Sequence, residues 1–241
     1  MNVLSIGNSF SQDAQRYIHG IARADGEKVN VFNLYIGGCS LARHYRNMLS
    51  GEKIYSLEMN GVSTGFFVSL SEALLSREWD VVTLQQASPE STDYKNYQPY
   101  LDRLTEYVRR CSPKAKIVIH ETWAYEDGSQ RLCERMGYSR RGEMFEDLSE
   151  AYALAAKAVD ADLLIPSGEL FEKLVESGIT EIHRDTFHAS LGIGRYALGL
   201  LWYAILTGND ISDNEFCDFD EEICREDIEL IKECVTECCE M

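Results

Sequence analysis

The chain has 241 residues, of which 40 are acidic and 23 basic, and its formal net charge at pH 7 is -17. This acidic balance argues against nucleic acid or an anionic membrane surface as the main partner, and no apolar run approaches the length of a membrane span. A secretory signal needs a basic segment and an apolar core before the folded domain, but the first expected strand already begins at Val3. A cytoplasmic location is therefore expected. No Pro/Gly/Ser-rich linker divides the chain, which predicts one domain over residues 1–241.

Apolar, β-rich runs alternate along the chain with segments of helical periodicity. Strands are expected in residues 3–7, 28–36, 79–88, 115–123 and 161–168. Helices are expected in residues 14–22, 70–77, 100–111, 144–159, 170–177 and 192–206, and an acidic, cysteine-containing helix at about 220–240. This alternation predicts an α/β fold: a three-layer α/β/α domain around a five-stranded, mainly parallel sheet in the flavodoxin-like order 2-1-3-4-5.

Two segments do not fit this alternation. Residues 52–68 contain Asn60-Gly61 between alternating residues, which is a hairpin signal and predicts a small β excursion near the site. Residues 124–141 show little periodicity and predict a second, irregular excursion after the fourth strand. Both are long enough to wall a pocket.

The eight cysteines are scattered, with five of them toward the end of the chain. In a cytosolic protein of this size they are expected to be reduced thiols. Cys234, Cys238 and Cys239 could bind a soft metal, but the spacing lacks a matching second pair or a nearby histidine. A partly buried helix face is favoured, and no metal site is predicted.

The first strand runs directly into the sequence GNSF, residues 7–10, at a strand-to-helix junction. Ligands of open α/β sheets bind at the carboxyl ends of the strands, which places Ser9 well for chemistry. The alternative is that Ser9 or Ser11 only caps the helix, which is the commoner role of serine at such a position.

A second pattern, near the other end of the chain, supports a catalytic role for that serine. Asp185 and His188 are three residues apart, so the carboxylate can hold the imidazole by one nitrogen. A serine nucleophile needs this pair, because a neutral imidazole must accept its proton. His183 competes as the base but has no carboxylate at the same offset on its N-terminal side.

Candidate donors to a developing oxyanion follow two of the strands. Gly37-Gly38 after the second strand lets a backbone N–H approach a substrate, although an ordinary turn is equally compatible with the pair. Gln85-Gln86 ends the third strand, and burying two amides there is costly unless they find partners. One of them is therefore expected to face the site.

These blocks resemble the SGNH (GDSL-like) hydrolases. The family's serine block, Gly-Asp-Ser-(Leu), is matched by residues 7–10, its second-block glycine by Gly38, and its Asp-x-x-His block by residues 185–188. The resemblance covers Val3 to about Leu206. Asn8 stands where the family usually has Asp, as in a divergent bacterial subgroup with a Gly-Asn-Ser-Phe block, and the sequence LQQAS replaces the third block, Gly-x-Asn-Asp.

The resemblance implies a serine esterase without a metal or organic cofactor. Ser9 would attack the carbonyl, His188 would relay the proton and Asp185 would orient His188. The oxyanion would be held by the N–H groups of Ser9 and Gly38 and by the side chain of Gln86, or of Gln85. Topology also places further residues at the site as expected substrate contacts: Asn8, Glu121 and Trp123.

The expected substrate is a small-molecule ester with a small acyl group, of which an acetylated carbohydrate is the first candidate because several aromatic side chains could stack on a sugar: Tyr94, Trp123, Tyr125 and Tyr138. A lipid ester or a thioester would need a longer apolar groove.

Two other classes of function stay open. One is a ligand-binding protein that has lost turnover, which a Gln pair pointing away from Ser9 would indicate. The other is an anion-binding loop at residues 7–9, which leaves Asp185 and His188 unexplained.

Overall fold

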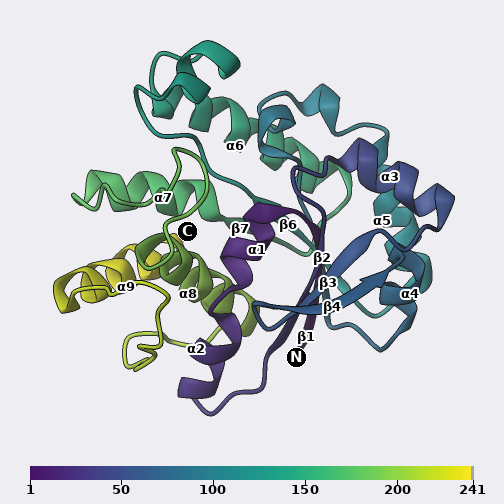
Figure 1. Cartoon of the computed structure of the whole chain (residues 1–241), viewed down its shortest axis with the longest axis horizontal. Coiled ribbons are helices and arrows are strands. Elements are labelled where there is room, and N and C mark those ends of the chain that lie inside the picture. Colours follow the sequence, from purple (N-terminus) through teal and green to yellow (C-terminus); the bar gives the residue numbers. More distant parts are fainter. Residues whose placement is uncertain (240–241) are drawn as a thin grey trace.

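A seven-stranded sheet lies between two layers of helices in the computed structural model, which describes residues 1–239 (Figure 1). The strand order is β4-β3-β2-β1-β5-β6-β7. β1 pairs in parallel with β2 and β5, and β5-β6 and β6-β7 are also parallel, whereas β3 is antiparallel to β2 and β4. The strands are β1 (Asn2–Gly7), β2 (Asn30–Tyr35), β3 (Tyr55–Met59), β4 (Val62–Val68), β5 (Val81–Leu84), β6 (Lys116–Glu121) and β7 (Leu163–Pro166).

The predicted sheet of five strands is wrong in the number of strands, and the order of the whole sheet differs because two strands are added at one edge. The five predicted strands themselves lie in the expected order, β2-β1-β5-β6-β7. The hairpin predicted as a separate excursion, β3-β4, extends the sheet beyond β2. Asn60 at its turn explains the docking: its N–H donates to Val31 O at 2.8 Å and its Oδ1 accepts from Val31 N–H at 2.9 Å. Asn60 and Gly61 both have positive φ, 52° and 76°, as a tight two-residue hairpin turn requires. The free edge of β2 is thereby paired.

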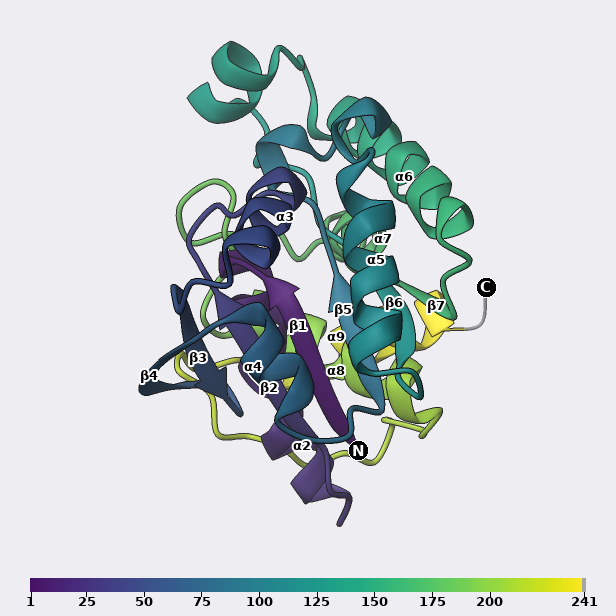
Figure 2. The same cartoon turned by 90° about the vertical axis from the view of Figure 1, so that its right-hand side faces the viewer.

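Two groups of helices cover the two faces of the sheet. Figure 2 shows α3, α4, α5 and α6 in front of the strands and α7, α8 and α9 behind them, and α1 and α2 pack on α8 in that rear layer. The helices are α1 (Ser9–Gln15), α2 (Ile18–Ala24), α3 (Leu41–Ser50), α4 (Leu70–Leu75), α5 (Tyr100–Cys111), α6 (Arg141–Ala158), α7 (Ser167–Glu176), α8 (Ile193–Thr207) and α9 (Arg225–Cys239), with short helical turns η1 (Ser88–Glu90), η2 (Tyr94–Asn96) and η3 (Arg131–Met136).

The C-terminal helix predicted at about 220–240 is α9, and residue 240 lies outside the described residues. Cys234 and Cys238 are buried on this helix, whereas Cys239 is exposed. No group of three or more His, Cys, Asp or Glu side chains within residues 1–239 is arranged to hold a metal ion. In the same range, no helix combines the length and the apolar character needed to cross a membrane.

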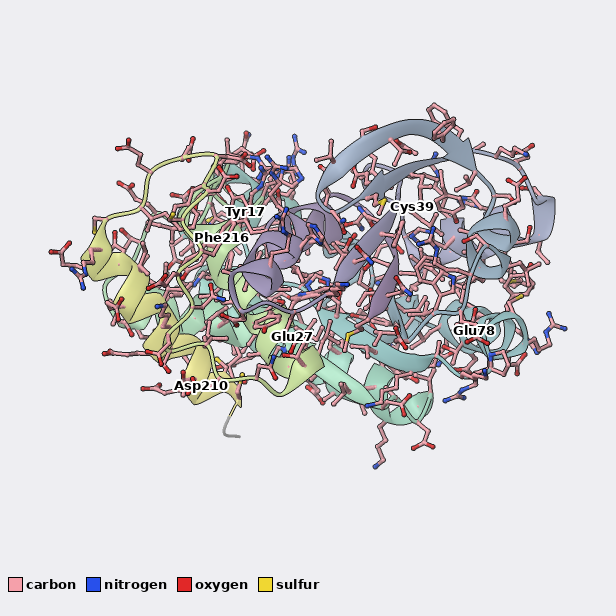
Figure 3. All side chains as sticks on the ribbon, turned by 90° about the horizontal axis from the view of Figure 1, so that it is seen from below. Tyr17, Glu27, Cys39, Glu78, Asp210 and Phe216 are labelled. Carbon is pink, nitrogen blue, oxygen red and sulfur yellow. The ribbon has the colours of Figure 1, made fainter. Side chains whose placement is uncertain are left out.

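The segment before α9 holds the start of α8 against α1 and α2. The ring of Tyr17 packs against Phe216 with 5.4 Å between centroids (Figure 3). The Tyr17 hydroxyl donates to Leu191 O at 2.6 Å and accepts a hydrogen bond from Asp220 N–H at 2.6 Å. Since Leu191 lies three residues after His188, these contacts hold the Asp185–His188 loop beside the junction of α1 and α2.

Candidate active site

Ser9 lies at the junction between β1 and α1, on a turn fixed by its neighbours. Asn8 is the N-cap, and its Oδ1 accepts a hydrogen bond from Phe10 N–H at 3.0 Å while Ser11 Oγ accepts from Asn8 N–H at 3.0 Å. A Cβ on Gly7 would lie 2.0 Å from Ser11 Oγ, so only glycine fits there. The capping role falls to Asn8 and Ser11, which leaves the Ser9 hydroxyl free for another partner.

That partner is His188. Nε2 of the imidazole lies 2.8 Å from Ser9 Oγ, and Nδ1 lies 2.8 Å from Asp185 Oδ2. The second carboxylate oxygen, Oδ1, accepts from His188 N–H at 2.9 Å. Partial burial alone would raise the pKa of Asp185, but these hydrogen bonds hold it below its usual value. The carboxylate is therefore ionised, and with Nδ1–H donating to it, Nε2 can accept the serine proton.

The competing histidine, His183, does not reach the serine. Its Nε2 lies 3.1 Å from Ala124 O, and burial lowers its pKa to about 4. His183 therefore serves the packing of the loop.

Gly38 approaches the serine from the end of β2. Its φ of 59° lies in the left-handed region, which glycine adopts without strain. Gly38 lines the same cavity as Ser9 and His188. Within residues 1–239, neither Ser9 N–H nor Gly38 N–H has a hydrogen-bond partner. Both donors are available to a ligand.

The Gln85-Gln86 pair lies elsewhere. Gln86 Nε2 donates to Asn96 O at 2.9 Å, and its Oε1 accepts from Leu41 N–H at 3.0 Å. Gln85 Nε2 donates to Asn8 Oδ1 at 2.8 Å, so it supports the serine turn from behind. Neither carboxamide is among the groups that line the cavity. The geometry gives no support to the predicted oxyanion role of Gln86 or Gln85, and we replace it with a structural one.

Trp123 and Glu121, predicted as substrate contacts, are both buried below the site. The indole of Trp123 packs 4.3 Å from the ring of Phe10, and its Nε1–H donates to Phe187 O at 2.8 Å. Glu121 Oε1 accepts from Glu169 N–H at 3.2 Å, and burial raises the pKa of this carboxyl to about 7. Neither side chain lines the cavity, whereas Asn8, the third predicted contact, does. Trp123 supports the loop that carries His188.

The cavity at Ser9 has a volume of about 370 Å³. None of the four aromatic residues predicted to stack on a sugar is part of its lining. Ser88 follows the predicted Gln pair by two residues, so its position near a strand end could have indicated that it lines the cavity. Nothing in the aperiodic 124–141 segment distinguished Arg131. The lining residues that sequence reasoning missed are Phe10, Gln12, Tyr35, Ser88, Pro89, Arg131, Arg184 and Phe187.

The sequence model of one family, described as a domain of unknown function (DUF4886), matches residues 2–235. The chain belongs to the DUF4886 family. No curated protein matches it. A DUF4886 family protein from Bacteroides uniformis has 29% sequence identity and a TM-score of 0.92, with 99% of this chain and 94% of that chain covered.

Two further solved structures share the fold of the DUF4886 chain. A candidate SGNH hydrolase from Slackia heliotrinireducens has 23% identity and a TM-score of 0.62, over 86% of this chain and 98% of that one. A candidate GDSL-like lipase from Parabacteroides merdae has 14% identity and a TM-score of 0.59, over 86% of this chain and 95% of that one. The fold is therefore that of the SGNH hydrolases.

Proposed function

We propose that this DUF4886 protein is a serine esterase that hydrolyses carboxylic esters with a short acyl group. One observation carries the proposal: Ser9 Oγ and Asp185 Oδ2 each lie 2.8 Å from a different nitrogen of the His188 ring. A serine hydroxyl is a weak nucleophile unless a base accepts its proton, and the base works only in the correct tautomer. Ser9, His188 and Asp185 meet both requirements.

The reaction proceeds in two halves. Ser9 Oγ attacks the ester carbonyl carbon while its proton passes to His188 Nε2, and the tetrahedral intermediate collapses as the C–O bond breaks. The imidazolium gives that proton to the departing alkoxide, which leaves as the alcohol. Water then attacks the acyl-serine in the same way, and the carboxylic acid and free Ser9 are released. Asp185 stabilises the imidazolium in both halves.

The intermediate's negative oxygen needs preorganised donors. The N–H groups of Ser9 and Gly38 support this role because they border the cavity and have no partner within residues 1–239. A volume of about 370 Å³ lies at the lower end of the range for small-molecule sites and suits a short acyl group with a compact alcohol. An acetylated carbohydrate satisfies this size limit.

A second candidate is a ligand-binding protein with little turnover. The orientation of the Gln pair favours it, because both carboxamides are engaged away from the cavity and leave the oxyanion without a side-chain donor from the third block. Removal of one such donor costs about 100- to 1000-fold in turnover in other serine hydrolases. The two candidates thus differ in the turnover number.

Hydrolysis of 4-nitrophenyl acetate and 4-nitrophenyl decanoate tests the proposal. The acetate should be cleaved faster, and Ser9→Ala should lower kcat by at least about 10⁴-fold while the melting temperature stays unchanged. Ser139→Ala, at an exposed serine outside the cavity, is the matched control and should behave as the wild type. Equal hydrolysis by Ser9→Ala would refute the esterase, and saturable ester binding without hydrolysis by the wild type would favour the second candidate.

A further inference from the structure

The cavity at Ser9 has a charge opposite to that of the molecule. The chain carries 40 acidic and 23 basic residues. Yet the part of the chain that the structure describes contributes two arginines, Arg131 and Arg184, to the cavity lining and no aspartate or glutamate. A neutral ester needs no such arrangement.

The charge of Arg184 is already compensated. Its Nη1 lies 2.9 Å from both carboxylate oxygens of Asp13, and the same nitrogen donates to Ala189 O. Asp13 is fully buried and also binds Arg195 Nε at 2.9 Å. Arg184 is therefore part of an internal ion-pair cluster.

Arg131 has no such compensation. No carboxylate within residues 1–239 forms an ion pair with it. Its guanidinium carbon lies 3.7 Å from the ring centroid of Phe187 and 5.9 Å from that of Tyr125. The Phe187 ring in turn lies 3.8 Å from the ring of His188. One aromatic ring thus separates the proposed base from a guanidinium that has no carboxylate partner among the described residues.

The position of Arg131 in the fold fits an outer wall of the cavity. It begins η3, in the segment between β6 and α6 that stands out beyond the sheet at the top of Figures 1 and 2. The arrow of β1 points toward this end of the sheet in Figure 2, and Ser9 begins α1 two residues after β1 ends at Gly7. A ligand group that extends outward from Ser9 would meet the guanidinium.

We propose that the esters cleaved at Ser9 carry a carboxylate, and that Arg131 binds it. The inference rests on the proposed esterase function. A guanidinium matches a carboxylate with two parallel hydrogen bonds, and stacking on Phe187 holds its plane in place. The net charge of -17 repels an anion, but salt screens that repulsion beyond about 8 Å at physiological ionic strength, so the local arginine decides the binding.

Matched ester pairs test this substrate class and show which side of the ester carries the charge. The acyl-side pair is mono-4-nitrophenyl succinate and its methyl ester. The alcohol-side pair is 4-carboxyphenyl acetate and 4-(methoxycarbonyl)phenyl acetate. In the wild type, the anionic member of at least one pair should have a KM about tenfold lower than its neutral partner, as expected for a charge-assisted hydrogen bond. Preference for the neutral member in both pairs would overturn the proposal.

Variants separate charge recognition from a structural role. Arg131→Gln should raise KM for the preferred anionic ester about tenfold and change KM for its neutral partner less than twofold. Arg131→Lys should retain part of the preference. Arg135→Gln, at an exposed arginine of the same turn that does not line the cavity, is the matched control and should resemble the wild type. An equal change for both members in Arg131→Gln would mean that Arg131 only supports Phe187, which contradicts the proposal.

Binding to the Ser9→Ala protein keeps this test independent of turnover. Calorimetric titration should show mono-4-nitrophenyl succinate or 4-carboxyphenyl acetate binding about tenfold more tightly than its methyl ester, and the preference should disappear in the Ser9→Ala, Arg131→Gln double variant. Preference without hydrolysis by the wild type would support the carboxylate site and reject the esterase. Hydrolysis of neutral esters that requires Ser9, without any preference for the anionic ester, would support the esterase and reject the carboxylate site.

Discussion

Gln86 and Ser9 follow neighbouring parallel strands, β5 and β1, yet only Ser9 reaches the cavity. Strand parity favoured Gln86 as the inward residue, but β5 ends at Leu84, and alternation no longer applies beyond it. The carboxamide instead accepts hydrogen bonds from Leu41 N–H and Ala87 N–H, at 3.0 and 2.9 Å. Gln86 therefore ties the start of α3 to the end of β5.

Gln86→Ala should accordingly affect stability more than catalysis. The change leaves two buried N–H groups without an acceptor, and each unsatisfied group costs about 1–3 kcal/mol. We expect the free energy of unfolding, measured by urea titration, to fall by about 2–4 kcal/mol, whereas kcat of the folded protein changes less than tenfold. A 100-fold loss of kcat with unchanged stability would restore the oxyanion role to Gln86.

At the scale of elements, an ion-pair cluster joins α1, which carries Ser9, to the loop that carries His188. Asp13 on α1 is fully buried between Arg184 of that loop and Arg195 of α8. Arg184 N–H also donates to His188 O at 3.0 Å. The cluster thus fixes the two halves of the proposed catalytic unit relative to each other.

Asp13→Ala should be strongly destabilising because it leaves two arginines without their shared carboxylate. Breaking a buried ion pair by removing one partner costs about 3–5 kcal/mol. Glu78→Ala, which removes the highly exposed pair with Lys114, is the control and should leave the free energy of unfolding nearly unchanged, because solvent screens an exposed pair. Urea unfolding of both variants measures the difference. Similar losses in the free energy of unfolding would show that the cluster at Asp13 stabilises the protein no more than an exposed ion pair does.

Local sequence patterns predicted the elements but not all of their neighbours. The Asn60-Gly61 turn could be predicted because asparagine and glycine are the residues that most readily adopt the positive φ found at both positions. The docking of its hairpin on β2 could not be predicted, because it depends on contacts between separate segments of the chain. The spacing of Asp185 and His188 likewise predicted their contact, because it is local. Arg131 belongs to an aperiodic segment, and only the tertiary structure brings it to Phe187.

At the scale of the whole molecule, stability should depend on pH through buried groups whose pKa values are shifted, and a buried acid and a buried histidine act in opposite directions. Burial raises the pKa of Glu121 to about 7 in the folded state, whereas the unfolded chain ionises this group at its ordinary value of about 4.3. Burial lowers the pKa of His44 and His120 to about 3 and that of His183 to about 4, so these groups bind more protons in the unfolded chain and raise the free energy of unfolding as pH rises. Glu121 acts in the opposite direction. Between its two pKa values the folded state binds more protons at this carboxyl, so its contribution lowers the free energy of unfolding as pH rises and levels off above about 7. The net charge of -17 at pH 7 adds self-repulsion in the same direction.

Glu121→Gln isolates the contribution of that carboxyl. The amide oxygen can still accept from Glu169 N–H, but the side chain no longer titrates. The melting temperature at pH 8 minus that at pH 5 should be more positive in Glu121→Gln than in the wild type, because the variant gains stability at pH 8. An unchanged difference would show that Glu121 does not ionise in this interval.

Covalent labelling by a fluorophosphonate tests the central claim most directly, because the reagent reacts with a serine only when a base activates it. The wild type should gain one adduct in its intact mass, and tandem mass spectrometry of the tryptic peptide 1–16 should place it on Ser9 rather than on Ser5 or Ser11. His188→Ala should prevent labelling without loss of the fold. An adduct on another residue, or equal labelling of Ser9→Ala, would contradict the assignment of Ser9, His188 and Asp185 as one catalytic unit.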